Sequence, residues 1–318
     1  MLEPLAGTAN LSNVEVLTGG LANTNLKVKV ANTGLTCVIR IYTREQPVCE
    51  REVNAMEFVR SETKARNLPR VPVPRVFFAD PNGSLTGYPY AVVEYVEGVT
   101  LAEALQLASE NDLGVLGTLV GRAAAALSHL RLPWCGELGP SLELVRDWGT
   151  PLSVTVDHIR RCVQSPRAGR RMGTQLRRRL WRYIETNASE LQVLEDAYSL
   201  LHGDFKPQNI IVSRERDSWE LAAIVDWELA CAGPPLADLG TLLRRRSLHD
   251  DAFACGVAAA FQENGGTLPQ NWRRLARLLD LNAMCTFLDH RGERPHVFAD
   301  AVELIEHTLD DNERSYAR

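Results

Sequence analysis

Three side chains in the second half of the chain have the types and spacing that phosphoryl transfer requires. Asp204 precedes Asn209 by five residues, and Asp226 follows an apolar stretch predicted to form a hairpin. In such a transfer one carboxylate accepts the proton of the attacking hydroxyl, while an amide and a second carboxylate hold magnesium on the nucleotide phosphates. The pattern therefore indicates phosphoryl transfer, with Asp204, Asn209 and Asp226 as candidate residues.

The segment around Asp204 resembles a known family. His202, Gly203, Asp204 and Asn209 form an H-G-D-x-x-x-x-N pattern similar to that of the aminoglycoside phosphotransferase and choline kinase family of small-molecule kinases. The resemblance implies an α+β, protein-kinase-like fold with two lobes: an N-terminal antiparallel sheet plus one helix, and a larger, mainly helical C-terminal lobe. It also implies the cofactors ATP and Mg2+, with Asp204 as catalytic base and with Asn209 and Asp226 as metal ligands.

Lys206 and the spacing after Asp226 refine the resemblance. Lys206 resembles the lysine in the D-x-K-P-x-N form of serine/threonine protein kinases, so we expect it to neutralise the γ-phosphate during transfer. Only twelve residues separate Asp226 from Asp238, which leaves no room for the activation segment of a protein kinase. A small-molecule kinase is therefore favoured, and Asp238 is expected to cap the next helix and to fasten the catalytic loop.

A glycine-containing loop precedes the second predicted strand. Residues 14–41 alternate between apolar and polar side chains as strands do. Gly19, Gly20 and Asn23 lie between the first two strands and are similar to the G-G-x-x-N loop of choline-kinase-like enzymes, which implies nucleotide binding. Paired glycines let backbone N–H groups approach phosphates, although an ordinary hairpin turn needs the same residue types.

Arg40 and Glu52 are predicted to pair. Arg40 lies in the strand of residues 37–41, where the resemblance implies a cation that binds the α- and β-phosphates. Glu52 lies on the apolar side of the helix predicted over residues 46–66, and a carboxylate there needs a cationic partner. The alternatives are a solvated strand charge for Arg40 and a surface position for Glu52.

The resemblance also implies a hinge that binds the nucleotide. The fifth strand is expected to contact adenine through the main chain, with the Glu94 carbonyl and the Val96 N–H as partners. The lobe boundary is placed near Gly98, which gives an N-terminal nucleotide-binding lobe of residues 1–97 and a C-terminal catalytic and acceptor-binding lobe of residues 98–318.

The C-terminal part is predicted to be mainly helical, with a helix over residues 175–198 and a connecting loop over residues 132–151. Residues 160–182 contain nine arginines and no acid. Such a run is typical of a solvated helix face or an interaction surface. If it overhangs the acceptor cleft, it disfavours a strongly cationic acceptor. Acids beyond residue 275 are candidates for acceptor binding: Asp280, Asp289, Glu293 and Asp300.

Composition limits the partners of this 318-residue chain. Its formal net charge is −5, which gives no reason to expect nucleic acid binding. Seven cysteines lie far apart without a C-x-x-C pair, as in a protein with reduced thiols. No signal peptide and no membrane-spanning stretch are recognised. We expect a cytoplasmic protein, monomer or homodimer, that binds a small-molecule hydroxyl acceptor, with neither nucleic acid nor membrane as a partner.

The sequence thus predicts an ATP-dependent O-phosphotransferase that moves the γ-phosphoryl group to a small-molecule hydroxyl. The family's acceptors include aminoglycosides, choline, ethanolamine, thiamine, homoserine and macrolides, and the motifs do not choose between an antibiotic and a metabolite. GTP in place of ATP also stays open, because hinge contacts are main-chain. The alternative is a nucleotide-binding pseudokinase or scaffold that uses the arginine-rich face for a partner.

Overall fold

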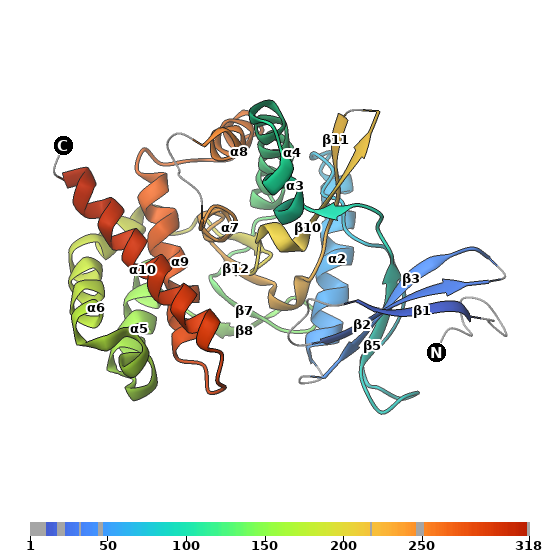
Figure 1. Ribbon diagram of the computed structural model, residues 1–318, viewed down its shortest axis with the longest axis horizontal. Coiled ribbons are helices and arrows are strands. Elements are labelled where there is room, and N and C mark those ends of the chain that lie inside the picture. Colours follow the sequence, from blue (N-terminus) through green and yellow to red (C-terminus); the bar gives the residue numbers. More distant parts are fainter. Residues whose placement is uncertain are drawn as a thin grey trace.

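The computed structural model describes residues 11–17, 23–31, 33–43, 47–216, 218–245 and 251–316. Gly19 and Gly20, predicted to bind nucleotide, lie outside these residues. Figure 1 shows a sheet at one end of the molecule and a group of helices at the other, with helix α2 and the β10–β11 hairpin between them. This arrangement confirms the predicted α+β, kinase-like architecture with an antiparallel N-terminal sheet.

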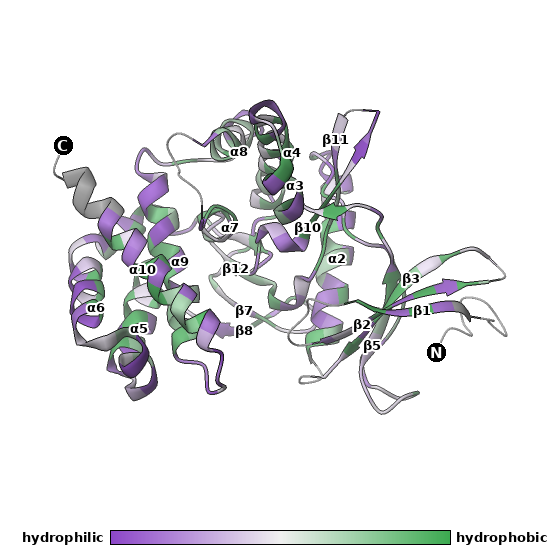
Figure 2. Cartoon of the chain, in the orientation of Figure 1, coloured by the Kyte–Doolittle hydropathy of each residue, from purple (hydrophilic) through white to green (hydrophobic). Residues whose placement is uncertain are grey.

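The N-terminal sheet has five antiparallel strands in the order β1-β2-β3-β5-β4. Its strands are β1 (Leu11–Leu17), β2 (Asn23–Val30), β3 (Thr36–Tyr42), β4 (Val76–Asp80) and β5 (Tyr90–Glu94). Alternating apolar residues of these strands form a small core of their own, which Figure 2 shows as the hydrophobic parts of β3 and β5. Helix α2 (Pro47–Ala65) follows β3 and packs against β4 and β5. The sheet and α2 therefore place Arg40 opposite Glu52.

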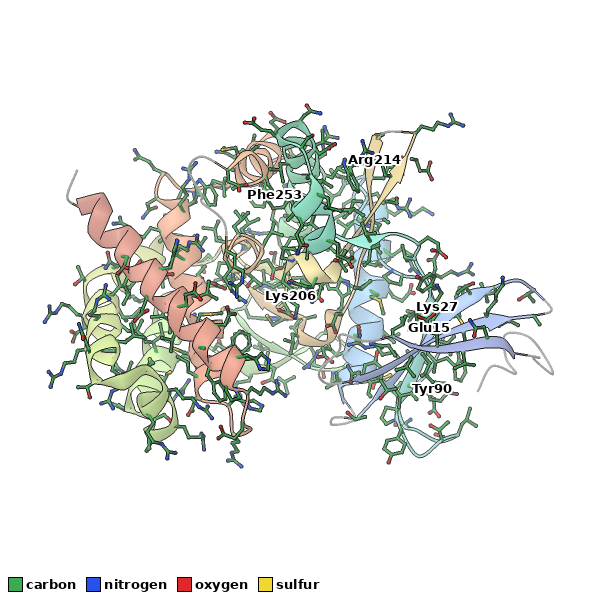
Figure 3. The ribbon with its side chains drawn as sticks, viewed as in Figure 1. Glu15, Lys27, Tyr90, Lys206, Arg214 and Phe253 are labelled. Atoms are coloured by element: carbon green, nitrogen blue, oxygen red, sulfur yellow. The ribbon has the colours of Figure 1, made fainter. Side chains whose placement is uncertain are left out.

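The C-terminal part is mainly helical. Its helices are α3 (Leu101–Leu107), α4 (Glu110–Ser128), α5 (Pro151–Gln164), α6 (Pro166–Asn187), α7 (Leu236–Leu242), α8 (Ala252–Glu263), α9 (Trp272–Leu288) and α10 (Pro295–Tyr316). Capping boxes at Thr100, Ser109 and Thr150 satisfy the first free N–H groups of α3, α4 and α5. Helices α4 and α8 pack closely at Gly117, which has no side chain. A Cβ there would lie 2.3 Å from the Phe253 carbonyl oxygen, so this approach requires glycine. Figure 3 shows Phe253 in this region.

Short strands replace part of one predicted loop, and a 3-10 segment replaces the end of one predicted helix. Residues 132–151, predicted to be a loop, contain β7 (Gly136–Leu138) and β8 (Leu144–Asp147), which join β9 (Ser199–Leu201) and β12 (Cys231–Gly233) in a sheet of order β8-β7-β12-β9. The prediction was wrong because strands of three or four residues show no clear alternation, and β7 pairs with the distant β12 as well as with β8. The helix predicted over residues 175–198 likewise ends at Asn187, and a 3-10 segment, η1 (Ala188–Leu194), follows it.

A second small sheet supports the catalytic segment. Strands β10 (Ile210–Glu215) and β11 (Ser218–Ile224) form the predicted hairpin, and β6 (Val99–Thr100) pairs with β10 on its other side. The segment with Asp204 and Asn209 runs between β9 and β10, and it closes with a 3-10 turn, η2 (Pro207–Asn209). Among the described residues, no helix is both long enough and apolar enough to cross a membrane.

Candidate active site

The loop of residues 202–209, called the catalytic loop here, lies between β9 and β10. Two of its side chains contact Asp204. The Lys206 ammonium lies 2.6 Å from Asp204 Oδ2. The Asn209 amide donates to the Asp204 carbonyl oxygen at 2.9 Å and to Asp204 Oδ2 at 3.1 Å. Figure 3 shows Lys206 near the centre of the molecule, between the sheet and the helical part. The structure therefore brings together Asp204, Lys206 and Asn209, as the sequence predicts.

His202 braces this loop from behind. Its ring is fully buried, and its Nε2 lies 2.9 Å from the Val225 carbonyl oxygen, which can only accept. The Asp204 N–H donates to Nδ1 at 3.2 Å, so a neutral ring with the proton on Nε2 satisfies both bonds. Burial lowers the pKa of His202, which favours this neutral form. The imidazole therefore fixes the backbone of Asp204 and carries no proton to substrate.

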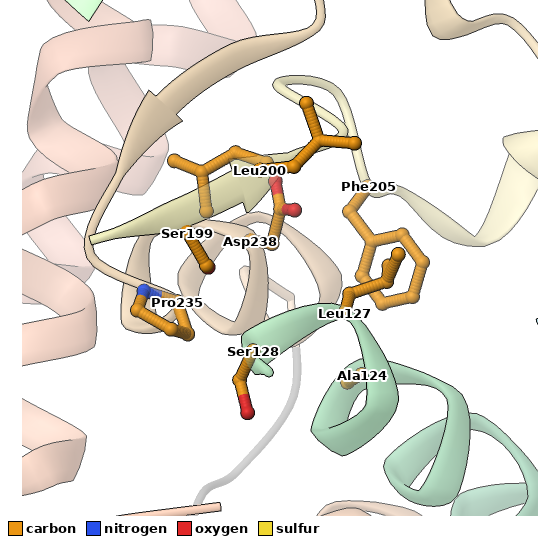
Figure 4. A pocket seen from close by; sticks show the side chains of 9 residues that line it. Ala124, Leu127, Ser128, Ser199, Leu200, Phe205, Pro235 and Asp238 are labelled. Atoms are coloured by element: carbon orange, nitrogen blue, oxygen red, sulfur yellow. The ribbon is translucent and has the colours of Figure 1, made fainter. Parts of the chain in front are cut away.

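Asp238 fastens the loop but does not cap its helix. Its carboxylate accepts from the His202 N–H at 2.7 Å and from the Gly203 N–H at 3.1 Å. The N-cap position of α7 belongs instead to Pro235, so the predicted capping role was wrong. Burial raises the pKa of Asp238 to about 7, against the lowering effect of these two bonds. Figure 4 shows Asp238 beside a cavity of about 10 Å³, room for one water at most, so the back of the loop admits no substrate.

We expect Gly203→Ala to disrupt the loop. Gly203 has φ +80°, and a Cβ there would lie 2.1 Å from the Leu229 carbonyl oxygen. The left-handed conformation alone costs an L-residue about 1–2 kcal/mol, and the clash adds to it. The variant should lose at least about tenfold in kcat and unfold at a lower temperature, measured by steady-state ADP formation and a thermal melt. Gly87→Ala is the control, because Gly87 also has a positive φ but open space around its Cβ position. Equal effects of both substitutions would exclude the clash as the cause.

The β10–β11 hairpin places the segment of Asp226 beside Asn209. Ile210 pairs with Ile224 across the hairpin, and the Val225 N–H donates to the Asn209 carbonyl oxygen at 2.9 Å. Asp226 thus follows directly beside Asn209, in a left-handed conformation with φ +71°. Because Asn209 uses its amide nitrogen on Asp204, its side-chain oxygen is left as a ligand atom. An amide oxygen and a partly exposed carboxylate fit magnesium, which takes one or two carboxylates with phosphate oxygens and water.

Arg40 lies at the centre of a group of three carboxylates. Its Nε lies 2.9 Å from Glu52, its Nη2 lies 3.3 Å from Glu228, and the same Nη2 pairs directly with Asp226. Although burial alone lowers it, the carboxylates of Glu52 and Asp226 raise the pKa of Arg40. The predicted contact between Arg40 and Glu52 is confirmed, and the guanidinium stays charged beside the predicted metal ligand Asp226.

Glu52 has a wider role than the predicted ion pair. It is only 2% exposed, and it accepts from the Tyr42 hydroxyl at 2.7 Å and from the Trp227 N–H at 3.1 Å. Trp227 is the residue that follows Asp226, so one buried carboxylate connects β3, α2 and the segment of the predicted metal ligand. Helix α2 therefore sets the position of Asp226 as well as that of Arg40.

Glu228 and Arg51 belong to this site but were missed by the sequence analysis. Glu228 is 8% exposed and accepts from the Asn23 amide at 2.6 Å, which places Asn23 against the Asp226 segment. Arg51 donates to the Leu138 carbonyl oxygen at 3.0 Å and to the Glu228 carbonyl oxygen at 2.8 Å. The position of Glu228, two residues after Asp226, was a signal in the sequence that Glu228 could belong to the site. Arg51 contacts only backbone carbonyl oxygens here, and such contacts leave no signal in the sequence.

The segment predicted to be the hinge lies between β5 and β6. The Glu94 N–H donates to the Arg75 carbonyl oxygen at 2.8 Å, and the Glu94 side chain accepts from the Arg75 N–H at 3.1 Å. Val96 makes no hydrogen bond within the described part of the chain, which leaves its N–H available. The contacts of Glu94 and Val96 with adenine stay predictions.

A cavity of about 570 Å³ lies next to the catalytic loop. Its walls come from β8, α5, β12, α7 and α9, and they include Gly203, which directly precedes Asp204. This size suits a small organic molecule. A molecule bound here would therefore lie beside the residue that precedes Asp204.

The fold and this arrangement define a kinase-like phosphotransferase. The model of the phosphotransferase enzyme family matches residues 13–278 of the chain. The protein therefore belongs to this family of phosphotransferases. The comparison with curated proteins finds no match to the sequence.

Solved structures of aminoglycoside phosphotransferases have the same fold. The GDP and kanamycin complex of APH(2")-IIia is 17% identical, with a TM-score of 0.72 and 98% of both chains covered. A thermostable mutant of APH(4)-Ia with ADP and hygromycin B is also 17% identical, with a TM-score of 0.62 and coverage of 97% of this chain and 96% of that one. A putative aminoglycoside phosphotransferase from Ralstonia eutropha JMP134 is 16% identical, with a TM-score of 0.64 and coverage of 98% and 96%. At these identities the likeness shows the fold alone.

Proposed function

We propose that the protein is an ATP-dependent O-phosphotransferase that moves the γ-phosphoryl group to a hydroxyl of a small molecule. The observation that carries the proposal is the position of Asp204. It is held by Lys206 and Asn209, the backbone of Asn209 binds Val225, which precedes Asp226, and Gly203, which precedes Asp204, lines the large cavity. Each component of phosphoryl transfer thus has a residue in a fitting place.

The residues divide the work by position. Asp204 accepts the proton of the acceptor hydroxyl and orients it toward the phosphate. Lys206, 2.6 Å from Asp204, neutralises charge on the transferred group. Asn209 and Asp226 hold magnesium, which neutralises the phosphate oxygens when bound. Arg40, whose Nε is held by Glu52, supplies the positive charge for the α- and β-phosphates. Catalysis is therefore positioning and charge neutralisation.

Solved relatives support a nucleotide donor, since their structures contain GDP, ADP or AMP-PNP. Kanamycin and hygromycin B in two of them support a small-molecule acceptor. For this chain we infer ATP as donor, bound through Glu94 and Val96 at the hinge. The acceptor lies in the cavity beside Gly203.

Magnesium-dependent release of ADP from ATP tests this function. Purified protein is assayed with amino alcohols, thiamine, amino acids, sugars, aminoglycosides and macrolides, and the phosphorylated product is identified by mass spectrometry. We expect at least one acceptor to raise the rate of ADP release, and EDTA to abolish it. Nucleotide binding without turnover on any acceptor, and with no effect of magnesium, would instead identify a nucleotide-binding scaffold.

A further inference from the structure

The acceptor cavity is lined by one face of α5 and one face of α9. Asp157, His158 and Arg161 lie on the α5 side, and Asp280 and Thr286 on the α9 side. Asp157 and His158 precede Arg161 by four and three residues, and on α9 Asn282, which also lines the cavity, precedes Thr286 by four, as expected for residues on one side of a helix. Arg146 and Asp147 of β8 complete the charged part of the wall. The charge that an acceptor meets is therefore set by these few side chains and by Asp238 at the loop.

Most carboxylates of this wall are already engaged by the protein. Asp280 receives two nitrogens of Arg244, at 2.9 Å and 2.8 Å, and it is only 7% exposed. Asp157 pairs with Arg160 at 2.7 Å. Asp238 accepts from the backbone of the catalytic loop. A polycationic acceptor would have to compete with arginines already in place, at a cost in affinity.

The acids predicted to bind acceptor show the same pattern outside the cavity. Asp289 lies 3.5 Å from Arg167, and Glu293 lies 3.7 Å from Arg171. Asp300 pairs with Arg245. Of the four predicted acids, only Asp280 lines the cavity, and it is the one most completely paired. The C-terminal helices therefore offer the cavity no free carboxylate of the predicted set.

Arg161 is a cation of the wall that stays available. It is exposed, and it makes no ion pair or hydrogen bond through its side chain within the described residues. Arg146, which is 73% exposed, is 3.8 Å from Glu137 at its closest. Asp147 accepts from the Gly149 N–H at 2.7 Å, and both it and Asp157 are exposed acids. Among the charged residues that line the cavity, Arg161 is thus the one for which the described part of the chain shows no ion pair or side-chain hydrogen bond.

His158 adds no charge to the cavity wall. Its Nε2 lies 3.1 Å from the Asn282 carbonyl oxygen, which can only accept a hydrogen bond, so Nε2 carries the proton. Burial lowers the pKa of His158, and the nearby guanidinium of Arg161 lowers it as well. The imidazole is therefore neutral near pH 7, and Arg161 supplies the charge on this face of α5.

Other arginines of the basic run face the protein itself. Arg171 on α6 donates to the Leu288 and His290 carbonyl oxygens at 2.7 Å and 2.8 Å and lies over the Phe298 ring. Arg179 lies 2.6 Å from Asp310 on α10. Figure 1 shows α6 packed at the end of the molecule beside α10. These arginines attach α6 to the C-terminal helices, whereas Arg161 is directed by α5 to the acceptor cavity.

We propose that the acceptor carries an anionic oxyacid group, a carboxylate or a phosphate, in addition to its reacting hydroxyl, and that Arg161 binds this group. The inference rests on the proposed function for the position of the acceptor. A guanidinium fits both anions because its planar N–H groups match their paired oxygens. Arg146, an exposed residue of the same wall, adds attraction for the same charge. The acceptor class is therefore a hydroxylated acid and not a polycation.

Matched acceptors of different charge test the proposal by initial rates of ADP formation. The pairs are L-serine against ethanolamine and D-glycerate against glycerol, with glycerol 3-phosphate as the phosphate member and kanamycin as the polycation. We expect an anionic member of the set to exceed its neutral or cationic counterpart in kcat/KM. In Arg161→Gln its KM should rise about 10- to 100-fold with little change in kcat, because one charge-assisted contact is lost. A higher kcat/KM for ethanolamine, glycerol or kanamycin would overturn the proposal.

Calorimetric binding makes the result independent of turnover. D-glycerate and glycerol 3-phosphate are titrated into the protein with ADP and magnesium, and into Arg161→Gln and Arg178→Gln. Arg178 is an exposed arginine of α6 outside the cavity and serves as the matched control. We expect at least one probe to bind, with a Kd raised about tenfold or more by the first variant and unchanged by the second. No binding of either probe, or equal Kd values in all three proteins, would contradict the role of Arg161. Binding that depends on Arg161 without any ADP formation would instead leave Arg161 in place and remove the proposed kinase activity.

Discussion

Asp204→Ala is expected to lower kcat for ADP formation by about 10³-fold, within the usual range for removal of a general base. The carboxylate is the group that accepts the hydroxyl proton, and no other acid of the described chain is held by Lys206 and Asn209. Nucleotide binding should persist, because Arg40, Glu52 and the hinge are untouched. The measurements are single-turnover ADP formation with the best acceptor and the Kd of ADP by calorimetry.

The fold of the Asp204→Ala variant should also persist. The Asn209 amide keeps its 2.9 Å bond to the carbonyl oxygen of residue 204, and His202 keeps its bond to the backbone N–H. The midpoint temperature of thermal unfolding should therefore change by no more than a few degrees. Glu185→Ala, on the exposed side of α6, is the control and should match the unmodified protein. Turnover within tenfold of the unmodified protein would remove Asp204 from the base role.

The sequence predicted the parts of the site that follow from short spacings along the chain or from the periodicity of a helix. Asp204 and Asn209 lie five residues apart in one loop, so their proximity follows from chain geometry. The pair of Arg40 and Glu52 was predicted from helix periodicity, because a carboxylate on the apolar side of a helix requires a cation. The structure confirms that contact with a separation of 2.9 Å.

The parts that were missed depend on contacts between distant segments. Glu52 binds the Trp227 N–H, and Arg51 binds two backbone carbonyl oxygens far along the chain. A backbone partner can be any residue type, so nothing in the sequence identifies it. The arginine-rich run shows the same limit: composition gives its charge, but whether Arg171 points to the protein and Arg161 to a cavity depends on how α5 and α6 pack.

Arg40→Gln is expected to have the second large effect, on both stability and nucleotide affinity. Glu52 is 2% exposed, and the substitution would leave it beside Asp226 and Glu228 without a cation. An uncompensated buried charge of this kind costs about 3–5 kcal/mol. Loss of the guanidinium also removes the predicted contact with the phosphates, so KM for ATP should rise by about tenfold or more. Chemical denaturation and ATP-dependent steady-state kinetics measure the two effects separately.

The double variant Arg40→Gln/Glu52→Gln distinguishes charge repulsion from loss of packing. Neutralising Glu52 removes the buried unpaired carboxylate, while its amide can still accept from the Tyr42 hydroxyl or the Trp227 N–H. We therefore expect the double variant to be more stable than Arg40→Gln alone, yet to keep the raised KM for ATP, since the phosphate contact is still absent. Arg122→Gln, on the exposed face of α4, should leave both quantities unchanged. A double variant less stable than either single variant would contradict this explanation. Arg40 would then stabilise the fold through packing and hydrogen bonds, and not through charge pairing with the three carboxylates.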